Sequence, residues 1–332
     1  NHPLTESTIE LPMVMATVEC SSVSSVLVRN LLYSISQHTT KQHPVRFYIG
    51  FYDWRLLQNP QAILCQDLAK CDQLIKYLRV EKHIDIQFFP VANNSYVNAF
   101  KPCSSSHMWL SESLAKENKV IYLDRDMVVM EDLFPLWNVF SLFPKDLTLA
   151  MTNERHHTHD VKIKKVSKYH SGIRDAPGPY YIPPHGLNAG MALYHLQHMR
   201  EANTIKDYKL ILDLKMSLPL ADQDVINYHC IQQPHRCRVL PCKWNNRAKA
   251  QINVDHCDNT VEEGIIHGNR GLFLKSLSHK QYYATNMTLF QSFLDSFRPP
   301  PGDTTPLGRS KQLIEKFLVN DLKMSTDERW IC

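Results

Sequence analysis

Short apolar segments rich in β-favouring residues alternate with segments of helical spacing, and this alternation constrains the fold more than any other feature. The strand-like segments are residues 13–20, 45–51, 84–91, 120–124 and 148–153. Apolar residues recur at helical spacing in residues 21–37, 61–79 and 100–118. Such alternation is typical of a parallel sheet covered by helices. We therefore predict an α/β fold with a mostly parallel central sheet flanked by helices.

The second half of the chain is less regular. Residues 154–186 are polar and rich in His, Lys, Pro and Gly, which predicts a long surface excursion. The pattern then predicts a strand over 186–196, a loop and helix over 219–232, a strand over 238–246, and a strand and turn over 264–271. Residues 298–332 read as a proline-rich spacer and an amphipathic helix. We predict one domain over residues 12–297, with residues 298–332 packed on it or trailing from it.

Charge and glycine content exclude several classes of protein. A net charge of +4 over 332 residues is too small to indicate a nucleic-acid partner. Neither the dinucleotide-binding glycine fingerprint nor the phosphate-loop pattern occurs. No apolar window is long enough to span a membrane. Because the chain starts at Asn1 rather than Met, we expect a processed or truncated piece whose N-terminal signal or anchor could be missing.

The cysteines favour an oxidising compartment. Nine are present, and Cys230, Cys237, Cys242 and Cys257 lie close together in the chain. Zinc ligation is one interpretation, but no C-x-x-C pair occurs, so paired disulfides are favoured over zinc and over free thiols. Glycosylation acceptor triplets begin at Asn93 and Asn286. Together these features indicate the secretory pathway.

Two carboxylates follow the apolar segment 120–123, in the order Asp124, Arg125, Asp126. Residues i and i+2 of an extended segment point to the same side, so both carboxylates should converge on one patch with Arg125 pointing away. Parallel sheets bind ligands at the carboxyl ends of their strands. A divalent metal would relieve the repulsion between the two charges. The alternative is a polar turn in which one aspartate caps the next segment.

His267 also lies at the end of a predicted strand and precedes Gly268. A histidine there is often only a hydrogen-bonded residue. Two carboxylates and one imidazole, however, form a ligand set suited to Mn²⁺, whereas Ca²⁺ prefers oxygen ligands alone. The Gly-x-x-Gly sequence that begins at Gly268 offers backbone N–H groups that suit a phosphate.

Two further segments have a structural and a functional interpretation. Asp222 is a good helix N-cap and Asp224 a favourable first-turn acid, which leaves Gln223 as a polar group aimed into a cleft. The small residues of 186–190 either form an ordinary turn or let a ligand approach the backbone closely.

Histidine elsewhere in the chain carries weaker signals. His156, His157 and His159 could suggest zinc, but they lie in a polar loop without a fourth ligand, so a solvated face is favoured. Cys103 and His107 share one helix face, but no orienting third residue accompanies them, so a catalytic pair is disfavoured.

Four motifs in this order resemble the family 8 glycosyltransferases, which are retaining enzymes with the Rossmann-like, nucleotide-sugar-binding GT-A fold. They are D-x-D at 124–126, G-x-N-A-G at 186–190, D-Q-D at 222–224, and His267-Gly268. Within this family the chain is most similar to the glucoside xylosyltransferases, on residues 100–103, 241–245, 255–257 and 267–271. The resemblance runs from about Met13 to Phe297.

The resemblance implies a function. Such an enzyme moves xylose from UDP-xylose, with Mn²⁺, in α1,3 linkage onto glucose that is O-linked to EGF-like repeats, as on Notch. It also implies a type II membrane protein of the ER or Golgi lumen, attached only through an N-terminal anchor absent from this chain. A xyloside xylosyltransferase, or a transferase using UDP-glucose or UDP-galactose, is the alternative within the class. The pocket near Asn153, Glu154 and Asn188 would decide between them.

The resemblance also implies roles for individual residues. Asp124, Asp126 and His267 match the Mn²⁺ ligands. Asp222, Gln223 and Asp224 match the reaction site. The donor-binding positions are Thr17 and Val18 for the uridine region, Arg125 between the metal ligands, Asn188 and Ala189 for the sugar, and Gly268 for the diphosphate. His107 stands where the family usually has an arginine, and Arg270 replaces a lysine.

Two other classes remain open. The first is a transferase-like protein that binds a nucleotide sugar without catalysis. It stays open because His107 replaces the arginine that is usual in the family. A metal-dependent hydrolase could use the three histidines at 156–159. An activity assay separates the first from a transferase, and mutation of the three histidines tests the second.

Overall fold

The computed structural model describes residues 11–19, 26–52, 58–64, 68–91, 95–100, 104–154, 186–214, 218, 220–247 and 264–268. Its main sheet has seven strands in the order β3-β2-β1-β4-β7-β6-β8. Their bounds are β1 Met13–Glu19, β2 Val45–Phe51, β3 Ile84–Pro90, β4 Val120–Leu123, β6 Leu149–Asn153, β7 Leu187–Tyr194 and β8 Cys237–Leu240. The α/β fold is therefore confirmed.

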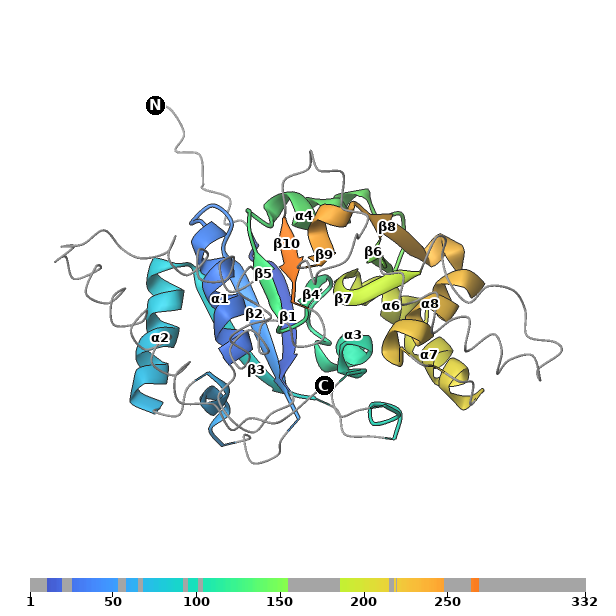
Figure 1. Cartoon of the computed structure of the whole chain (residues 1–332), viewed down its shortest axis with the longest axis horizontal. Helices are drawn as coiled ribbons and strands as arrows, with labels where there is room; N and C mark the ends of the chain where they lie inside the picture. The colour runs from blue at the N-terminus through green and yellow to red at the C-terminus, as the bar shows by residue number, and fades with distance from the viewer. Residues whose placement is uncertain are drawn as a thin grey trace, which may run out of the picture.

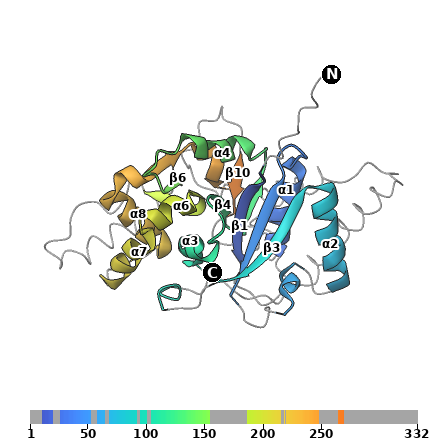
Figure 2. The same ribbon diagram turned by 180° about the vertical axis from the view of Figure 1, so that it is seen from behind.

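Among these strands, β7 runs antiparallel to both of its neighbours, β4 and β6. The remaining pairs, β1 with β2, β1 with β4, β2 with β3 and β6 with β8, are parallel. The sheet is therefore mostly parallel, as predicted. From behind, β3, β1 and β4 lie in this order away from helix α2 (Leu68–Glu81), and β2 lies between β3 and β1 in the sheet (Figure 2).

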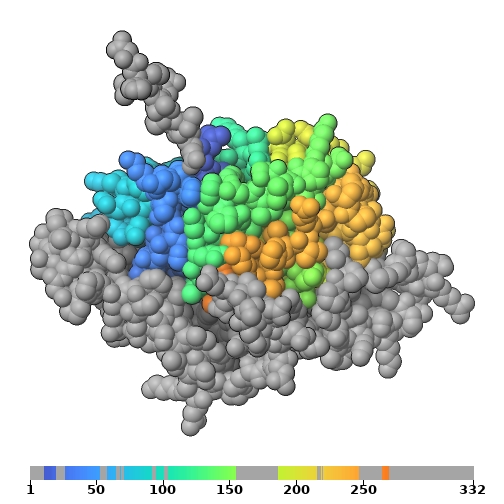
Figure 3. Space-filling model, turned by 90° about the horizontal axis from the view of Figure 1, so that it is seen from above, coloured from blue at the N-terminus to red at the C-terminus, as the bar shows by residue number. Residues whose placement is uncertain are grey.

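Helices pack against the main sheet, among them α2 against β3 and α8 (Asp222–Gln232) against β7. The α-helices are α1 Val26–His38, α2 Leu68–Glu81, α3 Leu110–Ser113, α4 Phe134–Asn138, α6 Leu196–Glu201, α7 Thr204–Asp213 and α8 Asp222–Gln232. Short 3₁₀ helices span Pro60–Ile63, Ser106–Trp109, Val139–Leu142, Pro234–Arg236 and Cys242–Asn245. In Figure 1, α1 and α2 lie at one end of the molecule and α7 and α8 at the other. In Figure 3, the green segment around α4 lies between these two ends.

Each face of the sheet buries its own apolar cluster. Along β1, Met13 and Met15 pack into one cluster with residues of α1, α2 and α4. Val14 and Ala16 pack into the other with residues of α3, α6 and α8. All seven residues of β1 are buried, because a central strand of a parallel sheet is covered on both faces.

A second, small sheet lies beside the end of β4. It contains β5 Met127–Val129, β10 Ile265–His267 and β9 Asn246–Arg247, with β10 in the middle. β10 pairs antiparallel with β5, so that His267 faces Met127. The pairing brings the end of β10 next to the turn that follows β4.

Three predicted elements have different bounds in the structure. The helix expected over 100–118 is confined to Ser106–Ser113, and residues 101–103 lie outside the described part. Arg200 caps the C-terminal end of this helix. Its guanidinium donates to the carbonyls of Ser111 and Glu117 at 3.1 and 3.0 Å. A continued helix would bond the Ser111 carbonyl internally.

The segments 61–79 and 238–246 also differ from the prediction. The first is divided between a 3₁₀ helix and α2. The second contains β8, a 3₁₀ turn and β9, which belong to two different sheets. Pro241 follows the last paired residue of β8, and a residue without an N–H cannot continue the ladder.

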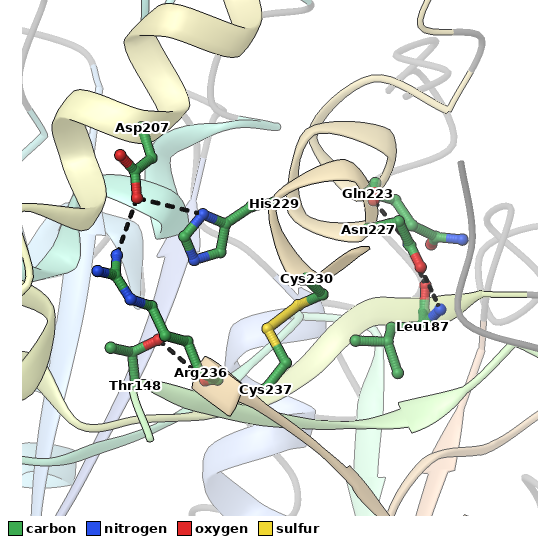
Figure 4. Close-up of a disulfide and its surroundings, with 9 residues drawn as sticks. All are labelled: Thr148, Leu187, Asp207, Gln223, Asn227, His229, Cys230, Arg236 and Cys237. Carbon is green, nitrogen blue, oxygen red and sulfur yellow. Dashed lines mark hydrogen bonds and ion pairs between the residues drawn. A yellow bond between two sulfur atoms is a disulfide. The ribbon is translucent and has the colours of Figure 1, made fainter. Parts of the chain in front are cut away.

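Helix α8 is fixed to the sheet at its middle and near its end (Figure 4). At the middle, Asn227 binds the backbone of Leu187 through both atoms of its amide, at 2.7 and 3.0 Å. At its end, a disulfide joins Cys230 to Cys237 at the start of β8. Cys71 and Cys242 are also in disulfides, so the oxidised state favoured by the sequence is confirmed for the cysteines described.

No helix among the described residues combines the length and apolarity needed to cross a membrane. The expected surface excursion lies outside the described residues over 155–185. The C-terminal segment 298–332 lies outside them as well.

Candidate functional site

Those predicted site residues that the structure describes gather at one edge of the main sheet. This edge holds the carboxyl ends of the parallel strands β1, β4 and β6. Because β7 runs the other way, its amino-terminal residues lie at the same edge, where Met191 pairs with Leu123. Ligands of α/β sheets bind outside the carboxyl ends of the strands. The fold therefore places segments 124–126 and 187–190 side by side.

Asp124, Asp126 and His267 form one cluster at this edge. One ligand atom from each residue lies within 4.8 Å of the others. His267 Nε2 is 3.4 Å from Asp126 Oδ1 and 3.7 Å from Asp124 Oδ2. Among the described residues, this is the one grouping of three or more such side chains that could hold a metal ion.

The aspartates lie in a turn after β4 and not in an extended segment, so the geometry expected for their convergence was wrong. Two backbone bonds hold the turn instead. The N–H of Asp124 donates to the Gly190 carbonyl at 2.8 Å, and the N–H of Gly268 donates to the Asp126 carbonyl at 2.7 Å. The carboxylates converge because β7 and β10 anchor the turn at either end.

The electrostatics of the cluster fit a divalent cation. Partial burial and then the charge of Asp126 raise the pKa of Asp124 to about 6. Burial works against the ionisation of Asp126, but His267 and Arg125 outweigh it and lower its pKa. A cation between the carboxylates would relieve this conflict. One nitrogen and two carboxylate oxygens form a ligand set that can hold a divalent metal ion.

Tyr122 supports the first aspartate from within β4. Its hydroxyl donates to Asp124 Oδ1 at 2.6 Å. Burial, followed by the charge of Asp124, raises the pKa of this phenol well above its usual value, so it remains a donor. The other oxygen of Asp124 faces His267.

Asn188 and Gln223 meet at the buried carboxylate of Glu154, and Ala189 joins them through Gln223. Asn188 Nδ2 donates to Glu154 Oε2 at 2.8 Å, and Gln223 Nε2 donates to the same oxygen at 3.3 Å. The N–H of Ala189 donates to Gln223 Oε1 at 3.3 Å. The start of α8 and the start of β7 thus share one polar network, which fixes the Gln223 amide.

Asp222 is bound to His107. His107 is 2% exposed, and its Nε2 is 2.9 Å from Asp222 Oδ2 while its Nδ1 is 2.8 Å from the Tyr194 hydroxyl. Its ring also stacks on Tyr122, with ring centroids 4.6 Å apart. Both nitrogens of His107 therefore contact protein groups. The ring positions the carboxylate of Asp222.

The predicted N-cap role of Asp222 was wrong. Ala221, with φ of 57°, is the N-cap of α8, and Asp222 is its first helical residue. The contact that closes the turn comes from Asp224, which accepts from the N–H of Leu220 at 2.7 Å. Asp224 is buried, whereas Asp222 is partly exposed at the edge of the site.

Arg125 and the end of β1 form a third part of the site. The Arg125 guanidinium pairs with the buried carboxylate of Glu19. Thr17 and Val18 precede Glu19 on β1 and are buried. The Thr17 hydroxyl has no hydrogen-bond partner among the described residues. The predicted uridine region thus lies on the strand next to β4.

The structure changes one expectation for Gly268 and leaves others outside its range. The Gly268 N–H is engaged by Asp126 and does not point freely toward a phosphate, because the β5–β10 ladder continues by one residue. Arg270, Cys103 and the three histidines at 156–159 lie outside the described residues.

Four residues of the network were assigned no role from the sequence: Glu19, Tyr122, Tyr194 and Asn245. Asn245 Nδ2 donates to Asn188 Oδ1 at 2.9 Å, and Asn245 Oδ1 is 3.0 Å from His267 Nδ1. No local pattern marks Glu19, Tyr194 and Asn245, because their partners lie on distant segments, whereas the partner of Tyr122 is Asp124 two residues further on. The sequence signal available for such residues was a polar side chain at the end of an apolar segment.

Comparison with solved structures identifies the fold. The chain aligns with mouse xyloside xylosyltransferase 1 at a TM-score of 0.55 and 17% identity, covering 78% of this chain and 98% of that one. It aligns with the galactosyltransferase LgtC, solved with donor and acceptor sugar analogues, at a TM-score of 0.57 and 18% identity, covering 90% and 100%. The fold is the GT-A fold of glycosyltransferases, as the motifs predicted.

The sequence comparisons place the chain more narrowly. The family model described as glycosyl transferase family 8 matches residues 30–267, and the chain belongs to this family. Glucoside xylosyltransferase 1 of Danio rerio is 27% identical over 287 residues, covering 82% of this chain and 66% of that protein. Glucoside xylosyltransferase 2 of Xenopus laevis is 25% identical over 306 residues, covering 80% and 69%. The match to the mouse type 1 enzyme covers 44% of that protein.

Proposed function

We propose that this chain is a retaining, Mn²⁺-dependent xylosyltransferase. It takes xylose from UDP-xylose and adds it in α1,3 linkage to glucose O-linked to EGF-like repeats. The observation that carries the proposal is the Asp124–Asp126–His267 cluster at the carboxyl edge of a GT-A sheet in a family 8 chain. The similarity to glucoside xylosyltransferases 1 and 2 supports the choice of sugar and acceptor.

Asp124, Asp126 and His267 would hold the metal. When bound, Mn²⁺ supplies Lewis-acid stabilisation of the diphosphate leaving group. The chain supplies the rest: Arg125 lies beside the cluster, and Tyr122 orients Asp124. The main-chain turn at 124–126 is fixed from both sides, so the ligands are placed before the donor arrives.

Retention of configuration follows from attack on the same face as the leaving group. The bond from C1 of xylose to the UDP oxygen breaks, the acceptor hydroxyl oxygen bonds to C1, and its proton passes to the departing phosphate oxygen. Gln223 is a poor nucleophile, and Glu154 and Ala189 hold its amide in place. We assign Gln223 and Asp222 to sugar positioning beside Asn188 and Ala189. We assign Asp224 a structural role in the site, because it accepts from Leu220 and so closes the turn at the start of α8.

In its full-length form the protein is proposed to be a single-pass type II protein of the ER or Golgi lumen. The disulfide between Cys230 and Cys237 supports an oxidising compartment. The triplets at Asn93 and Asn286 are consistent with it.

The test is UDP release from a panel of UDP-sugars, with Mn²⁺ or EDTA, with and without an O-glucosylated EGF repeat. We expect release from UDP-xylose that requires both Mn²⁺ and the acceptor. Release from UDP-glucose or UDP-galactose alone would retain the family and discard the xylose assignment. Absence of release from every donor, with the donor still bound, would identify a non-catalytic nucleotide-sugar-binding protein. A glycosyl adduct trapped on Asp222 or Asp224 would overturn same-face attack.

A further inference from the structure

The imidazole of His267 has one nitrogen toward the aspartates and the other toward Asn245. Nε2 lies 3.4 Å from Asp126 Oδ1, and Nδ1 lies 3.0 Å from Asn245 Oδ1. Both residues are buried. A neutral imidazole carries its proton on one nitrogen, and only the nitrogen without it can bind a metal. The tautomer of His267 therefore decides whether the cluster can hold a metal.

The donor and acceptor of each hydrogen bond in this network can be assigned in turn, beginning at Glu154. A carboxylate can only accept, so the Asn188 atom 2.8 Å from Glu154 Oε2 is the NH₂ group. A second contact fixes the same orientation independently. The N–H of Gly190 can only donate, and its bond of 3.0 Å goes to the other atom of the Asn188 amide, which is therefore the oxygen.

The orientation of Asn188 then fixes the orientation of the Asn245 amide. Because Asn188 Oδ1 accepts, the Asn245 atom 2.9 Å from it is the NH₂ group. The atom that Asn245 turns toward His267 is consequently its carbonyl oxygen, which can only accept. Nδ1 of His267 must donate to it, and this leaves the lone pair of Nε2 directed at the two aspartates.

We propose that Asn245 is a positioning residue that selects the Nδ1-protonated tautomer of His267, and that Glu154 sets its orientation through Asn188. Without Asn245 the two carboxylates would attract a proton to Nε2, and the metal-binding lone pair would be lost. The metal-binding part of this inference rests on the proposed function; the tautomer itself does not. Residues that orient a metal-bound histidine typically change metal affinity by about 10- to 100-fold.

The first test is the ¹⁵N spectrum of the His267 ring in the metal-free protein, at a pH at which the ring is neutral. A His267→Gln variant assigns the signal. We expect the proton on Nδ1 in the wild type and on Nε2 in Asn245→Ala. In Asn245→Asp, which keeps an acceptor toward the ring, Nδ1 should keep its proton. A wild-type ring protonated on Nε2 would overturn the inference.

The second test is Mn²⁺ affinity, measured from the EPR signal of free Mn²⁺ with no nucleotide present. We expect Asn245→Ala to weaken binding by about 10- to 100-fold, and Asn245→Asp, which loses the donor to Asn188 but keeps the acceptor toward Nδ1, to bind Mn²⁺ more tightly than Asn245→Ala. Glu154→Gln should also weaken binding, because Glu154 orients Asn188, which in turn orients Asn245. The matched control is Asn227→Ala, which removes another buried amide bonded to β7 and should leave affinity unchanged.

The outcomes separate this inference from the proposed function. If Mn²⁺ affinity falls equally in Asn245→Ala, Asn245→Asp and Asn227→Ala, Asn245 contributes packing and does not select the tautomer. If the wild type carries the proton on Nδ1 but transfers no sugar from UDP-xylose, the tautomer inference stands and the xylosyltransferase assignment fails.

Discussion

The His267 ring occupies the space that a side chain on Gly190 would need. A Cβ placed on Gly190 would lie 2.2 Å from Cε1 and 2.7 Å from Nδ1 of His267. Gly190 also donates to Asn188 and accepts from the N–H of Asp124. The glycine on β7 therefore allows the His267 ring on β10 to approach Asp124 after β4.

Gly190→Ala should displace the His267 ring and weaken Mn²⁺ binding by about tenfold or more, because ligand geometry is lost. Overpacking should also lower the free energy of unfolding by about 1 to 3 kcal/mol. Titration of Mn²⁺ monitored by EPR and urea unfolding measure the two effects.

The control for Gly190→Ala is Gly50→Ala on β2. A Cβ there would lie 2.7 Å from Cζ of Phe89, outside the metal cluster. It should cost stability without changing Mn²⁺ affinity. Wild-type affinity in Gly190→Ala would show that His267 does not need its present position.

Asp126→Asn should abolish sugar transfer while the protein still folds. Loss of a carboxylate ligand removes metal stabilisation of about 3 kcal/mol or more, which corresponds to at least about 100-fold in rate. UDP release with the active donor measures the loss, and circular dichroism checks the fold. The matched control is Asp146→Asn at an exposed turn, which should retain full activity. Normal transfer by the Asp126 variant would remove Asp126 from the metal site.

His107→Arg should destabilise the protein and should not raise transfer. The histidine lies buried between Tyr122, Tyr194 and Asp222, so a longer charged side chain overpacks the site at a cost of about 1 to 3 kcal/mol. Urea unfolding and UDP release measure the outcome. His235→Arg, at an exposed position, is the control. A stable variant with faster transfer would instead indicate that position 107 reaches the donor.

Removing the disulfide with Cys230→Ser and Cys237→Ser together should lower the free energy of unfolding by about 2 to 3 kcal/mol. The two cysteines are separated by 7 residues, and closing a loop of this length constrains the unfolded chain by roughly that amount. Urea unfolding under non-reducing conditions compares the double variant with the wild type. Equal stability would show that packing and the Asn227 contacts to β7 hold α8 to the sheet without the disulfide.

Stability should fall as the pH decreases from about 6.5 toward 4, in part through His229. Burial and then the nearby Arg236 lower the pKa of His229 to about 4 (Figure 4). The unfolded chain takes up the proton first, so acid favours unfolding across this interval. A shift of roughly two pKa units corresponds to about 3 kcal/mol by pH 4.

Urea unfolding between pH 7.5 and 4.5 tests the role of His229. His229→Gln should flatten the pH dependence relative to the wild type, whereas His235→Gln on the exposed neighbour should not. An unchanged slope in His229→Gln would assign the acid sensitivity to other groups, such as His195, whose pKa burial also lowers to about 4.

The sequence predicted the sheet because strand and helix patterns are local. The runs at 45–51, 84–91 and 187–194 have the composition and period of strands wherever they pair. It also placed Asp124, Asp126 and His267 at strand ends. It did not predict where the segment 100–118 stops being helical, because Arg200, far along the chain, binds the carbonyl that ends the helix.

The sequence by itself determined the α/β class and the residue types at the metal cluster. Only the tertiary structure decided that β7 runs against its neighbours and brings Gly190 to Asp124. It also decided that Asn245 faces His267 and that His107 holds Asp222. The physical reason is that a hydrogen bond between side chains on different strands depends on register and crossing, and no periodicity along the chain encodes either.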